Sequence, residues 1–176
     1  MASELVQLDQ LIIAPFETGM TKGVFSTPDP EFENLVHWYK VMAMHSQRDK
    51  KSKTYVAMFN ERVVGYVSVS IGHLKTIEGV KPLTKSFEFQ VLNVGKLYVE
   101  PSARSLGIGK RLMDFSLGIA QNIDEMIGCV GVIVDANTNE KTVNFYTRYG
   151  FEKIAGPEGK TVKMFFKLAE GAIIPK

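Results

Sequence analysis

Apolar runs with a strand-like pattern recur along the chain. They are rich in β-branched and aromatic residues, which favour strands, and polar or glycine-containing stretches separate them. Inside the longest run, Asn60 and Glu61 divide two apolar halves and predict a hairpin, with Asn60 better suited than Glu61 to a left-handed backbone. The predicted strands are residues 5–13, 53–72 (two strands), 86–101, 129–136, 151–156 and 161–168.

Three other stretches show helical spacing of apolar residues. The shortest begins near Asn139 and stops at Gly150, a residue typical of a helix C-terminus. The longest carries one apolar stripe along its whole length. The apolar positions are Phe32, Leu35, Val36, Tyr39, Met42 and Ala43 in the first helix, and Ile108, Leu112, Phe115, Ile119, Ile123, Met126 and Ile127 in the second.

Strands and helices alternate in the second half of the chain, so we expect an α/β (α+β) fold with part of its sheet parallel. A chain of 176 residues, 45% of them apolar, is long enough for one core. We therefore expect a single domain over residues 1–176, with 168–176 as a loosely held tail.

Charge and cysteine content narrow the function only slightly. A formal net charge of +2 neither requires nor excludes a nucleic-acid partner. The lone Cys129, which we interpret as inert packing, excludes an intramolecular disulfide and a thiolate metal cluster, and this suits a reducing compartment. No signal-peptide or membrane-span pattern is present. We expect a cytoplasmic protein without a membrane partner or a bound metal.

The stretch RSLGIGKRLM, Arg104–Met113, lies between a predicted strand and a predicted helix. Helix N-termini present unpaired N–H groups and a positive dipole end, and glycines such as Gly107 and Gly109 let a phosphate approach the backbone. Arg104, Lys110 and Arg111 would add positive charge. A tight solvated turn produces the same pattern, and the glycine spacing matches neither the dinucleotide fingerprint nor the P-loop.

Two motifs resemble signatures of the GNAT acetyltransferase superfamily. LYVEPSARSLGIGKRLM, which starts at Leu97, is similar to the acetyl-CoA-binding motif Arg/Gln-x-x-Gly-x-Gly/Ala. NEKTVNFYTRYGFEKI, which starts at Asn139, is similar to the second signature, and the resemblance covers about Val56 to Leu168. The matching positions are Arg104, Gly107 and Gly109 in the first motif, and Asn139, Phe145, Tyr146, Gly150 and Phe151 in the second.

The resemblance implies a GNAT fold with a mixed central sheet of about six to seven strands, a splayed fourth and fifth strand, and about four flanking helices. It implies acetyl-CoA as co-substrate, with the pantetheine arm pairing to the backbone of Leu97 and Val99. Gly95 is a candidate bulge at the splay, and amides from Arg104 to Lys110 would hold the pyrophosphate. Many members carry a small residue and then a cation between the arginine and the first glycine, and in this chain those places hold Ser105 and Leu106. The implied cofactor-binding set is Leu97, Tyr98, Val99, Arg104, Ser105, Leu106, Gly107, Ile108, Gly109, Lys110, Asn139 and Tyr146.

The implied reaction is direct acetyl transfer to a primary amine, which needs a proton acceptor and a proton donor. Tyr146 is the predicted general acid, and the N–H of Val99 is the candidate oxyanion donor. Glu88 is the first candidate for general base, acting through water, with a solvated strand carboxylate as the alternative reading. Glu100 and Asp135 are weaker candidates for the general base. Tyr149, His37, His45 and His73 are interpreted as structural, with His37 and His45 in a helix and His73 in a loop.

Three hypotheses about function stay open. The first is an N-acetyltransferase for a small molecule, peptide or protein. The second is a toxin-like enzyme acting on the amino group of aminoacyl-tRNA, a branch that the first helix, the hairpin and VDANTNEKTVNFYTRYGF loosely resemble. The third is a catalytically idle acyl-CoA-sensing domain. The basic loop at Arg48, Lys50, Lys51 and Lys53 either meets a phosphate backbone or is simply solvated. A homodimer also stays open.

Overall fold

The structure is a computed structural model that describes residues 10–22, 24–25, 30–76 and 88–169. The chain divides into two compact units, Met1–Ser70 with Gly95–Ser116 and Ile71–Val94 with Leu117–Lys176. Much of the predicted first strand and of the C-terminal tail lies outside the described residues. The single domain expected from the sequence stays a prediction.

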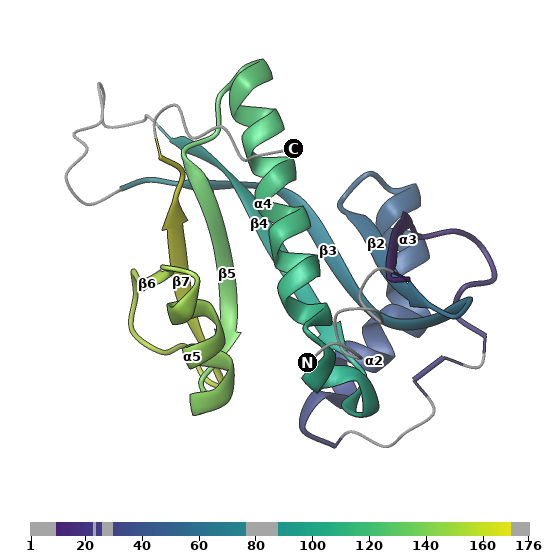
Figure 1. Cartoon of the computed structure of the whole chain (residues 1–176). Helices are drawn as coiled ribbons and strands as arrows, with labels where there is room; N and C mark the ends of the chain where they lie inside the picture. The colour runs from purple at the N-terminus through teal and green to yellow at the C-terminus, as the bar shows by residue number, and fades with distance from the viewer. Residues whose placement is uncertain (1–9, 23, 26–29, 77–87, 170–176) are drawn as a thin grey trace. The chain divides into compact units, whose positions relative to one another are not determined.

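The described residues contain a seven-stranded mixed sheet, as expected (Figure 1). Its order is β1-β2-β3-β4-β5-β7-β6, and strands β3 and β4 each pass from one unit into the other. The strands are β1 (Ile12–Pro15), β2 (Lys53–Phe59), β3 (Arg62–Leu74), β4 (Phe89–Val99), β5 (Gly131–Asn137), β6 (Glu152–Lys153) and β7 (Thr161–Lys167). The helical elements are η1 (Pro30–Phe32), α2 (Glu33–His37), η2 (Trp38–Met42), α3 (Ala43–Arg48), η3 (Pro101–Leu106), α4 (Ile108–Ile127) and α5 (Glu140–Arg148).

The sheet of the first unit is built on the β2–β3 hairpin, to which β1 adds on the other edge of β2. Asn60 and Glu61 have φ of 49° and 60°, the left-handed values that a two-residue type I′ turn requires. The predicted hairpin is confirmed. The left-handed conformation extends to Glu61, the less suited of the two residues.

A helical segment, α2–η2–α3, precedes this hairpin, and its middle turn, η2, is a π-helix. Tyr39 and Ala43 are fully buried, whereas Met42 is 45% exposed. The predicted apolar stripe is therefore wrong at Met42. A π-turn takes more residues per revolution than an α-turn, so Met42 is rotated away from the face that Tyr39 and Ala43 share.

Aromatic rings fill the core of the first unit. The Tyr39 ring lies 5.2, 5.1 and 4.8 Å from the rings of Phe16, Phe25 and Tyr66, measured between centroids. The Tyr66 hydroxyl donates a hydrogen bond to the Leu35 carbonyl at 2.7 Å. Buried tyrosines usually satisfy their hydroxyls in this way, and the bond links α2 to β3.

Helix α4 confirms the predicted second helix, with Ile108 and Leu112 buried at its start. Met126 and Ile127, at its other end, are 80% and 72% exposed, so the predicted stripe is wrong at these two positions. Both lie in the last turn before Gly128, which has φ of 92°. A stripe in a sequence does not reveal where the surface that a helix packs against ends.

The second unit has its own strand pairs. β4 runs parallel to β5, and β5 pairs antiparallel with β7 along all seven of its residues. Val91, Ile133 and Phe165 form a buried apolar cluster here. A Cβ at Gly131 would collide with the Phe166 carbonyl oxygen and the Phe165 ring, so this strand pair requires glycine there. In the part of the chain that the structure describes, no helix is long and apolar enough to cross a membrane.

Candidate active site

The end of β4 leaves its parallel partner before the strand finishes. The pairing joins Leu92, Asn93 and Val94 of β4 to Val132–Val134 of β5, and β4 continues to Val99 in the first unit. In the described register this parallel pairing does not reach Leu97 or Val99, which confirms the predicted splay of the fourth and fifth strands. A strand edge outside the ladder offers backbone donors and acceptors to another extended chain.

On its other side, the end of β4 is held closely by β3. A Cβ at Gly65 of β3 would lie 2.8 Å from the Tyr98 carbonyl oxygen and 3.3 Å from Cγ2 of Val99. The two backbones therefore approach at a distance that only glycine permits at this position. The N–H of Glu100 donates to the Val64 carbonyl at 2.9 Å, which extends the β3 contact to the residue after the strand.

A glycine turn then leads into α4. Gly107 ends η3 with φ of 73°, in the left-handed region. The first backbone bond of α4 runs from the Arg111 N–H to the Gly107 carbonyl at 3.1 Å. The amides of Ile108 and Gly109 precede this bond and lie outside the helical ladder, at the positive end of the helix dipole. This is the geometry of an anion site, and it fits a pyrophosphate.

The Arg104 side chain contacts the end of β4. Its Nε donates to the Val99 carbonyl at 3.0 Å, and its guanidinium lies 5.2 and 5.7 Å from the ring centroids of Phe32 and Tyr98. Arg104 thus stabilises the end of β4 through a hydrogen bond and cation–π contacts. A contact of its backbone amide with the cofactor stays a prediction.

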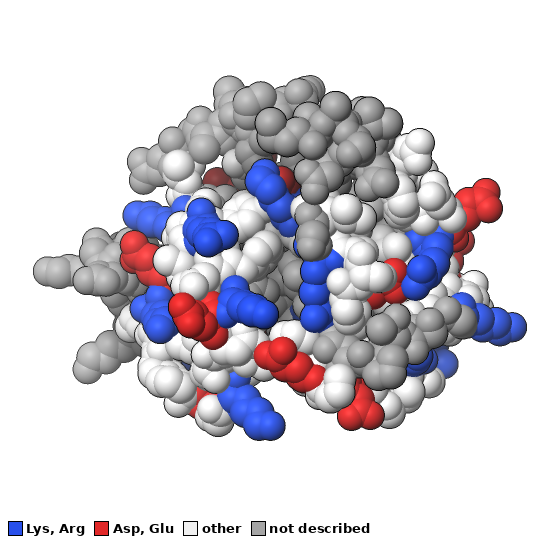
Figure 2. Space-filling model, turned by 60° about the horizontal axis from the view of Figure 1, so that its bottom comes forward, with Lys and Arg blue, Asp and Glu red and all other residues white. Residues whose placement is uncertain are grey.

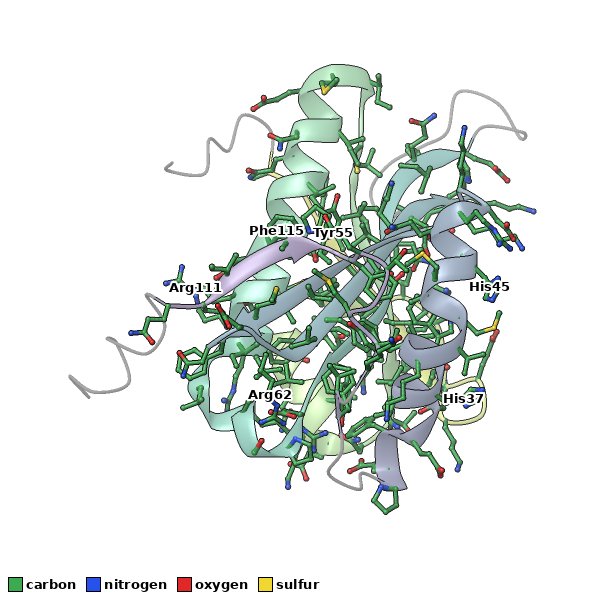
Figure 3. The ribbon with its side chains drawn as sticks, turned by 90° about the vertical axis from the view of Figure 1, so that its right-hand side faces the viewer. His37, His45, Tyr55, Arg62, Arg111 and Phe115 are labelled. Carbon is green, nitrogen blue, oxygen red and sulfur yellow. The ribbon has the colours of Figure 1, made fainter. Side chains whose placement is uncertain are left out.

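The two basic residues in the first turn of α4, Lys110 and Arg111, have different surroundings. Lys110 Nζ lies 3.2 Å from Oδ2 of Asp114, one helical turn further on. Arg111 is exposed and extends outward from the ribbon (Figure 3). Figure 3 also shows Phe115 beside Tyr55 of β2, and their centroids are 4.8 Å apart. This contact packs the first half of α4 against the hairpin.

Tyr146, the predicted general acid, lies on α5 in the second unit. Its ring is 7% exposed and packs against Phe145 and Phe151, with centroids 5.1 and 5.5 Å apart. Burial raises the pKa of the Tyr146 phenol well above its usual value. The phenol therefore stays protonated at neutral pH, as a proton donor must.

Asn139 is the N-cap of α5. Its Oδ1 accepts a hydrogen bond from the Thr142 N–H at 2.8 Å, and its own N–H donates to Oδ1 of Asn137 at 3.0 Å. The Asn139 side chain therefore caps the start of the helix that carries Tyr146. A contact of Asn139 with the cofactor stays a prediction.

Two carboxylates that the sequence offers as weaker candidates for the general base form ion pairs. Glu100 is 1% exposed and its Oε2 lies 2.6 Å from Nη2 of Arg62. Asp135 lies 2.8 Å from Nζ of Lys163. Glu88, just before β4 in the second unit, is exposed. Its role as general base stays a prediction.

None of the three histidines is part of the strand–turn–helix segment Leu97–Lys110. His37 and His45 are on the exposed side of the helical segment (Figure 3). His73 is part of β3 rather than of a loop, which corrects the expectation for that residue. Within the described ranges, no group of three or more His, Cys, Asp or Glu residues could hold a metal ion.

The sequence alone did not single out Arg62. The residue stands at the start of β3, and its partner Glu100 is 38 positions away. Because no local pattern connects two residues so far apart, only the pairing of β3 with β4 could reveal the contact. The contiguous positions Leu97–Lys110, by contrast, form one strand–turn–helix segment, as the motif predicts.

The family model described as an acetyltransferase (GNAT) domain matches residues 50–153, more than half of the chain. The chain therefore belongs to the GNAT acetyltransferases, in agreement with its mixed sheet and glycine turn. By class it is an acetyl-CoA-dependent N-acetyltransferase. No curated protein matches the chain in sequence.

Several solved structures share the fold. A tyrosine-to-phenylalanine mutant of the toxin AtaT, bound to the C-terminus of the antitoxin AtaR and acetyl-CoA, is 20% identical with a TM-score of 0.72, over 90% of this chain and 94% of that chain. A tyrosine-to-phenylalanine mutant of KacT is 19% identical with a TM-score of 0.73, over 90% and 95% of the two chains. AtaT complexed with acetyl-methionyl-tRNAfMet is 20% identical with a TM-score of 0.71, over 89% and 94%.

Proposed function

We propose that this enzyme transfers the acetyl group of acetyl-CoA to the α-amino group of an aminoacyl-tRNA. The observation that carries the choice of acceptor is the similarity, over 89% of the chain, to AtaT complexed with acetyl-methionyl-tRNAfMet. A small amine, a peptide or a protein is the competing acceptor. An idle acyl-CoA-sensing domain is the competing non-enzymatic role.

Acetyl-CoA would supply the activated thioester, and the first unit would bind it. The backbone of Leu97 and Val99 would pair with the pantetheine arm along the part of the β4 edge that is not paired with β5. The amides of the turn would hold the pyrophosphate, which the left-handed Gly107 and the late start of the α4 ladder support. The proposed binding set is Leu97, Tyr98, Val99, Arg104, Ser105, Leu106, Gly107, Ile108, Gly109 and Lys110, with Asn139 and Tyr146 from the second unit.

Three groups would carry the chemistry. The N–H of Val99 would donate to the carbonyl oxygen as negative charge develops there. The Tyr146 phenol would give its proton to the departing sulfur, and its raised pKa supports this role. Glu88 would accept the proton of the incoming amine through a water molecule. Each group is assigned by the family resemblance and by the properties described above.

An RNA acceptor needs cations that meet its phosphates. Figure 2 shows basic and acidic side chains interspersed on the face it presents, so the described residues form no continuous basic field there. The basic loop after α3 is a local source of positive charge. Asp49 lies 3.7 Å from Arg48 Nε and 3.5 Å from Lys51 Nζ. Lys50 and Lys53 are exposed, and we assign phosphate contacts to these two lysines.

The test is a thiol-release assay with acetyl-CoA and a panel of acceptors: charged tRNA, uncharged tRNA, polyamines, aminoglycosides, amino acids and peptides. We expect release with charged tRNA and none with uncharged tRNA, since only the former carries a free α-amino group. Release with a small amine or peptide alone would overturn the tRNA proposal. Acetyl-CoA binding without release on any acceptor would favour the idle-domain role.

The loop assignment has its own test. Lys50→Asn with Lys53→Gln should raise the KM for charged tRNA and reduce the salt dependence of RNA binding by about one unit of slope per lysine, with the KM for acetyl-CoA unchanged. Asn is chosen because Lys50 has φ of 57°. The matched control is Lys153→Gln with Lys167→Gln, two exposed strand lysines of the second unit. Equal effects of the two pairs would contradict the assignment.

A further inference from the structure

Glu100 stands between β4 and the glycine turn and is held by four hydrogen bonds. Its Oε2 accepts from Nη2 of Arg62 at 2.6 Å, and its Oε1 accepts from Oγ of Ser102 at 3.1 Å. Its backbone N–H donates to the Val64 carbonyl at 2.9 Å, and its carbonyl accepts from the Ala103 N–H at 3.0 Å. A single buried residue therefore connects β3 to the first turn of η3.

The cation that faces this carboxylate comes from the hairpin. Arg62 follows the type I′ turn directly and is the first residue of β3, so the β2–β3 ladder holds its backbone. Its side chain is half exposed, whereas the Glu100 carboxylate is removed from solvent. A buried carboxylate is tolerated only when it is paired and hydrogen-bonded. Figure 3 shows Arg62 beside the turn that precedes α4.

Arg62 and Glu100 belong to segments of different regularity, and this difference indicates which of the two residues holds the other in place. The hairpin is a regular ladder, while η3 is a short helix whose last residue precedes the left-handed Gly107. Short 3₁₀ segments have poorer hydrogen-bond geometry than α-helices, so η3 depends on outside contacts for a single conformation. The Arg62–Glu100–Ser102 chain of bonds supplies such a contact at the start of the turn.

We propose that Arg62 and Glu100 form a positioning pair that holds the η3 turn in the conformation that binds the pyrophosphate of acetyl-CoA. The proposal rests on the cofactor site proposed above. Arg62 acts through Glu100 and does not touch the ligand, because its charge is already engaged by the carboxylate. Loss of the pair should weaken cofactor binding through a looser turn and leave the chemical step intact.

The first experiment needs no ligand. Hydrogen exchange of the free protein compares wild type with Arg62→Met, which keeps much of the side chain's apolar length. Amides of residues 102–110 should exchange about tenfold faster in the variant, as loss of a charge-assisted hydrogen bond predicts. Amides of the β2–β3 hairpin should not change. The control is Arg148→Met on α5, an exposed arginine outside this region.

The second experiment measures acetyl-CoA affinity by calorimetry and KM and kcat by thiol release. Arg62→Met should weaken acetyl-CoA binding about tenfold, the same factor as the faster exchange, with kcat at saturation unchanged. Arg62→Lys should restore part of the affinity because it keeps the charge. Arg62→Met combined with Glu100→Gln should be no worse than Arg62→Met alone, since no buried carboxylate is then left unpaired.

The outcomes separate the two proposals. Unchanged exchange and unchanged affinity in Arg62→Met would overturn the positioning role. Faster exchange spread over the whole first unit, with a lower unfolding temperature and the same acetyl-CoA affinity, would also overturn it, because the pair would then only stabilise the fold. A wild-type protein that fails to bind acetyl-CoA would overturn the proposed function, and the exchange result would still decide whether the pair orders the turn.

Discussion

The Tyr146→Phe variant tests the proposed general acid with little disturbance of the fold. The substitution removes one oxygen and keeps the ring, whose contacts with Phe145 and Phe151 at 5.1 and 5.5 Å supply its packing. We therefore expect the free energy of unfolding to change by less than about 0.5 kcal/mol, below the usual contribution of a hydrogen bond.

Turnover should respond much more strongly. A positioned general acid contributes about 10²–10⁴ in rate, which corresponds to about 3–5 kcal/mol of activation free energy. We expect kcat to fall by that factor while the Kd of acetyl-CoA, measured by calorimetry, stays within about twofold, since a group that acts in the transition state contributes little to ground-state binding. The matched control is Tyr149→Phe, on the same helical stretch, which should keep wild-type turnover.

The pH dependence adds a check on the same group. The raised pKa of the Tyr146 phenol keeps it protonated below the ordinary tyrosine value of about 10. A loss of activity from its deprotonation should therefore appear only above pH ~10, and the variant should lack it. Turnover in Tyr146→Phe equal to wild type at saturating substrates would refute the assignment of the proton donor.

Four further predictions concern the turn, the strand contact, the cap and the core. Gly107→Asp should abolish acetyl-CoA binding in calorimetry, because a carboxylate would occupy the pyrophosphate position; retained affinity would place the anion site elsewhere. Gly65→Ala should cost about 1–3 kcal/mol in denaturant unfolding, since its Cβ would lie 2.8 Å from a backbone oxygen. Asn139→Ala should lose about 0.5–2 kcal/mol through the missing cap, whereas Asn139→Asp should not. Burial raises the pKa values of Tyr39 and Tyr66, so stability present below pH ~10 should be lost as pH rises above it; a transition unchanged to high pH would contradict this.

Several local structural features of this chain can be predicted from its sequence. The hairpin at Asn60-Glu61, the start of α4 after Gly107, and α5 between Asn139 and Gly150 all appear where the pattern predicts them. Each depends on residues within a few positions of one another: a turn that needs positive φ, a cap that needs a short polar side chain, a stop that needs glycine. The two family signatures are of this kind.

The apolar stripes fail to predict burial where a helix is irregular or extends beyond the surface that it packs against. Met42 follows the expected spacing but is turned outward by the π-turn η2. Met126 and Ile127 continue the α4 stripe into a turn that is exposed. Spacing identifies one face of a regular helix, and it carries no information about irregular turns or about the extent of the opposing surface.

In the site, the sequence by itself determined the order of strand, turn and helix from Leu97 to Lys110, because those residues are contiguous. Tertiary structure decided what their side chains do. Arg104 is turned back onto the Val99 carbonyl, and Glu100 forms an ion pair with Arg62. Pairing of β3 with β4 creates the Arg62–Glu100 contact, which joins residues 38 positions apart. Backbone conformation follows from neighbours in the chain, whereas the partner of a buried charge follows from which strands lie side by side.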